Sequence, residues 1–143
     1  MPYIDPWGIV PGGPAGGDLG GTYPNPTVAG FTLTRAGVPA VVTLTDAATS
    51  ATNAALGNVF RVVLGGNRTL GAPTNPTNGQ QATWIVVQDA VGARTLGYNA
   101  IFLFSGGVAP VVTATATRAS LLSGVYDSVG DNWLMRSDLD YAI

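Results

Sequence analysis

The fold of this chain is decided by residues 81–88, which read QATWIVVQ. The stretch contains a continuous apolar run of four residues, Trp84, Ile85, Val86 and Val87. A short apolar run bounded by turn residues is typical of a central strand in a sheet. The sequence therefore predicts a strand over residues 81–88, with the indole of Trp84 packed in the core.

Short strands are predicted on both sides of this stretch. Residues 58–64 alternate between two faces, which is typical of a half-buried strand. Gly65-Gly66-Asn67 predicts a hairpin turn into a strand over residues 68–70. Residues 50–56 could form either a short strand or a helical turn. Further strands are expected over residues 40–45, 94–98, 101–104, 119–126 and 132–136, and the turn at 127–131 predicts a closing hairpin. Residues 108–117 are a run rich in Val, Thr and Ala.

The composition agrees with many short strands and turns. The 143 residues include 20 Gly and 10 Pro, but no Lys, Glu, Cys or His, so good helix formers are scarce. Eight or nine strands at a spacing of roughly 8–12 residues favour an all-β domain. Because the turns are short, we expect antiparallel pairing in a β-sandwich or jelly roll of about eight strands.

Three regions are expected along the chain. Residues 1–37 are rich in Gly and Pro and predict an extended N-terminal anchoring arm, and residues 38–137 form the β-sandwich domain. Residues 138–143 predict a C-terminal tail strand, because apolar and polar residues alternate there. That strand is either a last edge strand or a strip that pairs with a neighbouring molecule.

The arm and the tail carry the residues that we expect to contact a partner. Apolar side chains lie at intervals among residues that break regular structure, so each could fill a separate pocket. The expected contact residues are Tyr3, Trp7, Leu19, Tyr23, Pro24, Pro26, Val28, Leu139, Tyr141 and Ile143.

Residues 16–28, which read GGDLGGTYPNPTV, carry a resemblance to known proteins. The segment resembles the Gly-Asp-Leu-x-Gly-x-Tyr-Pro-Asn-Pro-Thr-Val segment near the starts of bacteriophage fibre proteins and other virion surface proteins. Residues 60–80 resemble the β-rich domain that often follows it.

The resemblance implies a structural protein of a tailed-phage virion. The long arm and the small domain favour a capsid decoration or cement protein on the capsid surface, which fastens to the major capsid protein and to neighbouring copies. A homotrimer is implied by the resemblance alone. The alternative is a head or tail fibre module that recognises a glycan on the host surface.

Charge and hydropathy argue against two classes of partner. Six Arg and eight Asp give a net charge of −2, so there is no basic cluster for a nucleic acid. The sequence contains no stretch of about 18 apolar residues, so no membrane span is predicted.

The same inventory argues against catalysis. Without His, Cys, Lys or Glu, general acid–base chemistry falls to Asp and Tyr, and no enzyme activity, cofactor or metal site is expected. Asp127 and Asp131 are the nearest pair of carboxylates for hydrolysis or for Ca²⁺, but turn formation explains them better.

Aromatic residues and arginines complete the set of candidates. Tyr98, Tyr126 and Trp133 could bind a sugar, although Trp133, like Trp84, is better explained as a core residue. The arginines in and beside the strands are expected to be solvated, to pair with Asp, or to bridge subunits.

Overall fold

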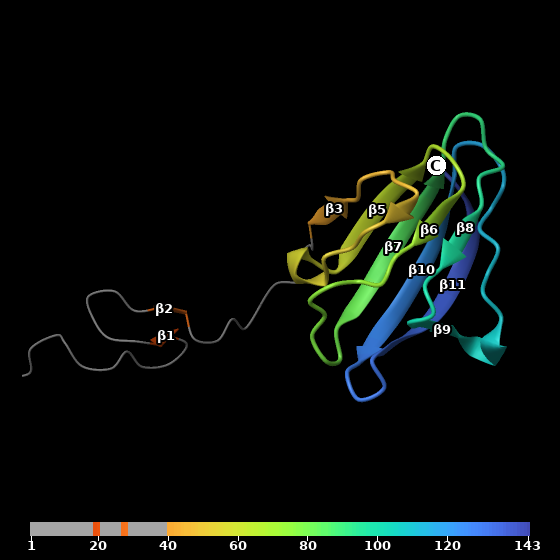
Figure 1. Cartoon of the computed structure of the whole chain (residues 1–143). Helices are drawn as coiled ribbons and strands as arrows, with labels where there is room; N and C mark the ends of the chain where they lie inside the picture. Colours follow the sequence, from red (N-terminus) through yellow and green to blue (C-terminus); the bar gives the residue numbers. More distant parts are fainter. Residues whose placement is uncertain (1–18, 21–26, 29–39) are drawn as a thin grey trace, which may run out of the picture. The chain divides into compact units, whose positions relative to one another are not determined.

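A computed structural model describes residues 19–20, 27–28 and 40–143 (Figure 1). The chain divides into two compact units, Met1–Val38 and Pro39–Ile143. In the first unit, β1 (Leu19–Gly20) pairs antiparallel with β2 (Thr27–Val28). The rest of the predicted arm lies outside the described residues.

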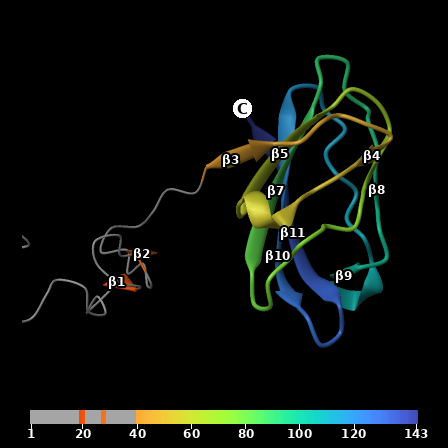
Figure 2. The same cartoon turned by 60° about the vertical axis from the view of Figure 1, so that its left-hand side comes forward.

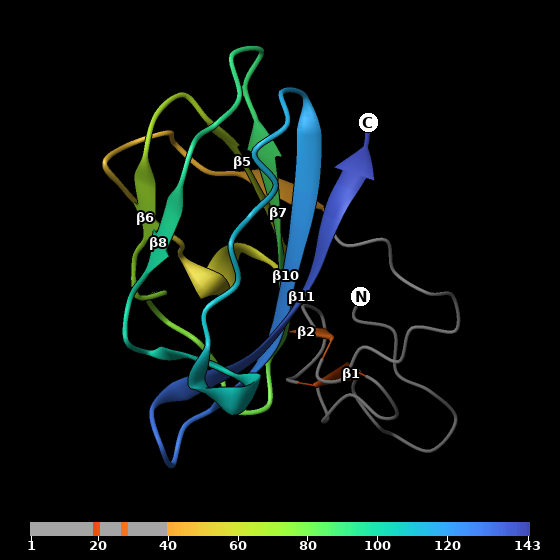
Figure 3. The same cartoon turned by 90° about the vertical axis from the view of Figure 1, so that its right-hand side faces the viewer.

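The second unit consists of two sheets, which Figures 2 and 3 show as separate layers. The six-stranded sheet has the order β3-β5-β7-β10-β11-β9, and the three-stranded sheet has the order β4-β6-β8. The strands of the two sheets are β3 (Val41–Thr43), β4 (Thr49–Ser50), β5 (Val59–Leu64), β6 (Arg68–Leu70), β7 (Gln81–Gln88), β8 (Leu96–Tyr98), β9 (Phe102–Phe104), β10 (Arg118–Asp127) and β11 (Asn132–Ala142). Two short 3₁₀ helices, η1 (Ala54–Leu56) and η2 (Ser105–Gly107), lie between them. The prediction of an all-β domain is confirmed.

From β3 to β8 the chain alternates between the two sheets. Each time it returns to a sheet, the new strand pairs parallel with the previous one, so β3, β5 and β7 stack in one sheet and β4, β6 and β8 in the other. We call this arrangement the parallel coil. A further parallel bridge joins Asn53 to Thr74, and the Asn75 amide donates to Asn53 Oδ1 at 3.1 Å.

The parallel coil corrects the expected antiparallel pairing. A parallel pair needs a long crossover connection, and the sequence shows no helix to supply one. Here a strand of the opposite sheet supplies the crossover instead. The predicted hairpin at residues 65–67 is wrong for the same reason, because β5 and β6 belong to different sheets. The antiparallel jelly roll is not confirmed.

A hairpin completes the six-stranded sheet. β10 pairs antiparallel with both β7 and β11, and β9 pairs parallel with β11 over three residues. The predictions of a central strand at 81–88 and of a closing hairpin are therefore confirmed. Residues 138–142 form the end of β11, which runs on without a break at residue 137.

Residues 108–117, the run rich in Val, Thr and Ala, form no strand. This segment is irregular, and side chains satisfy some of its backbone groups. The Gln88 amide donates to Thr113 O at 2.7 Å, and Thr113 N donates to Ser120 Oγ at 3.1 Å. Pro110 has no N–H to offer a sheet ladder. The segment instead packs Val112 into the core.

An aromatic cluster fills the space between the two layers. Trp84 stacks on Phe60 at a centroid distance of 5.7 Å and meets Phe102 and Trp133 edge-on at 5.6 and 5.1 Å. Both tryptophans are fully buried, so their predicted place in the core is confirmed. Buried aromatic groups of this size dominate the stability of a small core.

Candidate functional site

The core does not use the outer face of the six-stranded sheet. We use "outer face" for the side chains of this sheet that alternate with the core residues and point away from the three-stranded sheet. The strand register places them in four rows: Gln81, Val125, Leu134 and Leu103; Val41, Val59, Thr83, Ser123 and Arg136; Thr43, Arg61, Ile85, Leu121 and Asp138; Val63, Val87, Ala119 and Tyr141.

The outer face is largely apolar, and its residues are exposed or half-buried except for Val87 and Ala119 in the fourth row, which are buried. The three-stranded sheet lies on the opposite side, so no strand of the unit Pro39–Ile143 covers this face (Figure 3). Leu134 is 56% exposed and Val41 is 52% exposed. Val63, Leu103, Val125 and Tyr141 are also exposed. A contiguous apolar surface of this kind marks a site of interaction.

Two charged side chains stand at opposite sides of the third row. Arg61 lies on β5 and Asp138 lies on β11, with Ile85 and Leu121 between them. Neither forms an ion pair within the described ranges, where the ion pairs are Arg68–Asp46, Arg94–Asp89 and Arg118–Asp140. In this row the β5 side is therefore positive and the β11 side is negative, while Arg136 adds a positive charge to β11 in the second row.

The paired arginines confirm one prediction made from the sequence. Arg68 donates twice to Asp46, at 2.7 and 2.8 Å, and these hydrogen bonds hold the pKa of that carboxyl below its ordinary value. The Arg94 guanidinium lowers the pKa of Asp89 in the same way. Both pairs fasten loops of the parallel coil and leave the outer face free.

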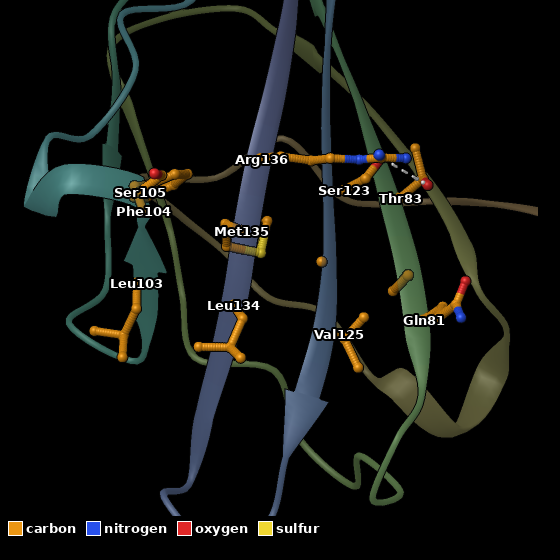
Figure 4. Close-up of a pocket in the computed structure, with 12 residues that line it drawn as sticks. Gln81, Thr83, Leu103, Phe104, Ser105, Ser123, Val125, Leu134, Met135 and Arg136 are labelled. Carbon is orange, nitrogen blue, oxygen red and sulfur yellow. Dashed lines mark hydrogen bonds between the residues drawn. The ribbon is translucent and has the colours of Figure 1, made fainter.

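A groove of about 580 Å³ crosses the outer face between its first and second rows (Figure 4). One wall is polar and contains Thr83 and Ser123, whose hydroxyl oxygens lie 3.1 Å apart in a hydrogen bond. The side chain of Arg136 extends along this wall toward them (Figure 4). The other wall contains Val125 and Leu134. Such a groove can hold an extended chain with one apolar and one polar edge.

The contact residues predicted in the arm are mostly outside the described part of the chain. This holds for Tyr3, Trp7, Tyr23, Pro24 and Pro26. Leu19 and Val28 are directly paired across β1 and β2. These assignments stay predictions.

The tail residues lie at the end of β11. Leu139 and Tyr141 are 43% and 44% exposed, and Ile143 follows the strand and is also exposed. Asp140 adopts a positive φ of 72° at a register shift, which interrupts the alternation expected from the sequence. Its carboxylate accepts from Thr113 Oγ1 at 2.7 Å and from Arg118 Nη1 at 3.2 Å.

The aromatic residues considered for sugar binding do not form a platform. Trp133 is fully buried, Tyr126 is buried, and Tyr98 is half-buried with its hydroxyl donating to Pro110 O at 3.0 Å. Burial raises the pKa of Tyr98 to about 12. These side chains serve the core and the segment that packs on β8.

Asp127 and Asp131 have structural roles in the closing hairpin. Asp127 Oδ1 accepts from Val129 N at 3.0 Å, and Asp131 Oδ1 accepts from the Tyr126 hydroxyl at 2.8 Å. The bond to Asp131 raises the pKa of Tyr126.

Among the described residues no three acidic side chains gather to hold a metal ion. The described ranges also contain no helix long and apolar enough to cross a membrane.

Sequence reasoning missed the outer face as a site. The signal was the second apolar face of the strands, carried by Ile85, Leu121 and their neighbours, which the core does not need. The alternation of residues 58–64 was predicted, including the face that carries Arg61. The missing information was which strands share a sheet.

Comparisons with known proteins give no relative for this chain. No protein-family model matches it, and the searches of curated proteins and of solved structures find no significant match.

Proposed function

We propose that this chain is a structural protein of a tailed-bacteriophage virion, a capsid decoration or cement protein without enzymatic activity. The observation that carries the proposal is the outer face, an exposed apolar sheet surface in a chain of low charge. The resemblance of residues 16–28 to a segment of virion surface proteins supplies the setting.

In this proposal the two units have different tasks. The arm, residues 1–37, fastens to the major capsid protein and to neighbouring copies, with Tyr3, Trp7, Leu19 and Tyr23 as the dominant anchors. The β-domain sits on the capsid surface as part of a homotrimer. Three linked arms add avidity without requiring strong individual contacts.

The copy number and location of the protein on intact particles test this proposal. Quantitative gels and imaging should show hundreds of copies spread over the shell. A handful of copies at a vertex or at the tail tip would overturn the decoration role. Deleting residues 1–28 should leave a folded β-domain that no longer binds capsids, and retained binding would contradict the role of the arm.

A second candidate is a fibre module that binds a host glycan. The polar wall of the groove, with Thr83, Ser123 and Arg136, is the observation that favours it. The burial of the aromatic candidates speaks against it, because exposed aromatic rings commonly stack on sugars. A glycan array probed with the full chain separates the two functions, since a cement protein should bind no glycan.

A further inference from the structure

The third row of the outer face has an order that suits self-association. Arg61 lies on β5 and Asp138 lies on β11, three strand spacings away, which is about 14 Å. Ile85 and Leu121 lie between them on β7 and β10. Within the described ranges, Arg61 and Asp138 have no partner in an ion pair, and both belong to a mostly apolar face.

A rotation axis that runs along the strands in front of this face makes the row complementary to itself. Such a rotation keeps each residue at its height along the strands, and it brings the β5 side of one copy opposite the β11 side of the next. Arg61 then meets Asp138 of the neighbouring copy at the same height. Ile85 of one copy faces Leu121 of the next near the axis.

We propose that the outer face binds a second copy of this chain, related by an axis along the strands, with Arg61 of one copy paired with Asp138 of the next. This proposal does not depend on the virion assignment. It commits the outer face to a copy of the same chain and not to the arm, a glycan or a foreign protein.

The other rows fit the same arrangement. In the fourth row, Val63 comes to face Tyr141, so apolar meets apolar, while Val87 and Ala119 are already buried within each copy. In the second row, Thr83 comes to face Ser123, and Arg136 comes to face Val59. No row then places two like charges opposite each other. An axis across the strands and centred on the third row would instead set Arg61 against Arg61.

The size of the face is sufficient for a specific contact. At strand and row spacings of about 4.8 and 6.8 Å, each position covers about 33 Å², so the positions that are not buried cover roughly 520 Å² per copy. Two such faces bury about 1,000 Å², which is about the minimum for a specific protein interface. The pairing holds for two copies about a two-fold axis and for three copies about a three-fold axis, and the second case is the proposed homotrimer.

Engineered thiols test the pairing directly, because the natural chain has no Cys. The variant R61C/D138C cannot close a disulfide within one copy, since its Cα atoms lie about 14 Å apart and a disulfide needs less than about 7 Å. Under mild oxidation of the full chain, we expect covalent dimers or trimers on a non-reducing gel. The control R61C/V129C moves the second thiol to the exposed tip of the closing hairpin. On the same gel it should run as a monomer without cross-links.

Charge reversal gives an independent readout. In light scattering and sedimentation, the full chain should be a closed oligomer, and R61D or D138R alone should weaken association at least about tenfold. The double variant R61D/D138R should regain most of the affinity, which a folding defect would not do. A monomeric natural chain, thiol cross-linking no greater than in the control, or no rescue by the double variant would each overturn the proposal.

Discussion

The indole Nε1–H of Trp84 donates to Thr52 Oγ1 at 3.0 Å, and both side chains are completely buried. Trp84 belongs to β7 of the six-stranded sheet, whereas Thr52 follows β4 of the three-stranded sheet. This single hydrogen bond therefore connects the two layers at the centre of the aromatic cluster. A buried donor without a partner is costly, so the pair is sensitive to substitution.

Removing the hydroxyl of Thr52 should destabilise the domain. We expect Thr52→Val to lower the free energy of unfolding by about 1–3 kcal/mol, because the shape is kept while the indole donor is left unpaired. Thr52→Ser keeps the hydroxyl and loses only a methyl group, so it should lower the free energy of unfolding by about 1 kcal/mol. Urea unfolding followed by tryptophan fluorescence measures both. A larger loss for the Ser variant than for the Val variant would contradict the role of this bond.

Gln88 should be more important to stability than Gln80, although each makes several hydrogen bonds. The buried Gln88 amide donates to Arg94 O at 2.8 Å and to Thr113 O at 2.7 Å, and accepts from Arg94 N at 2.9 Å. Gln88→Leu leaves these groups unpaired and should cost about 3 kcal/mol.

The matched control is Gln80→Leu. The Gln80 amide donates to Ala54 O, Gly57 O and Asn58 Oδ1, but the site is only partly buried, so water can replace the lost partner. We expect a loss of about 1 kcal/mol or less. Equal losses for the two variants, measured by chemical denaturation, would show that burial does not set the cost.

Gly92 and Gly79 separate backbone strain from steric clash. Both have positive φ, 74° and 76°. A Cβ at Gly92 would lie 2.8 Å from both Ala114 O and Ala116 N, whereas a Cβ at Gly79 would meet nothing within 4 Å. We expect Gly79→Ala to cost about 1 kcal/mol from strain alone. Gly92→Ala should cost about 2 kcal/mol more, because backbone atoms of the packed segment must move. Similar unfolding midpoints for the two variants would contradict this account.

Stability should fall in alkali through Tyr98. Its pKa is raised to about 12, above the ordinary value near 10 for an exposed tyrosine. The folded state thus holds the phenolic proton more tightly than the unfolded state. This contribution is fully present below pH 10 and is lost as the pH rises toward 12.

The variant Tyr98→Phe tests this pH dependence. It loses the hydrogen bond to Pro110 O, so we expect it to be about 1 kcal/mol less stable at pH 7. Its stability should then decline less steeply between pH 10 and 12 than that of the natural chain. Denaturant unfolding at several pH values compares the slopes, and an absorbance titration counts the ionising tyrosines. Parallel slopes would exclude Tyr98 as the cause.

The sequence predicted the elements of this fold better than their arrangement. The run at residues 81–88 was long and apolar enough to identify β7 with its observed bounds, and the turn at residues 127–131 identified the closing hairpin. Both signals are local. The pairing of β5 with β7 joins Phe60 to Trp84, although β6 lies between these strands in the sequence. No local pattern in the sequence predicts that contact.

The candidate site was less predictable for the same reason. Ile85, Leu121, Arg61 and Asp138 form one row only because four strands align in a particular register. Periodicity assigns each residue to a face of its own strand, but it does not tell which strands are neighbours. The sequence therefore identifies Arg61 and Asp138 as residues of strands, but it does not show that they lie on opposite sides of one surface.

The aromatic cluster also determines when the fold can be completed during synthesis. Phe60 and Trp84 leave the ribosome well before Trp133, which is 49 residues after Trp84 in the chain. At about 5–20 residues per second, this interval lasts roughly 2–10 s. During it the growing chain holds an indole that lacks one of its two edge-on partners, since Phe102 is made earlier than Trp133. β11 is thus translated after the other described strands of the domain, and a ribosome stalled before β11 would carry an unfinished core.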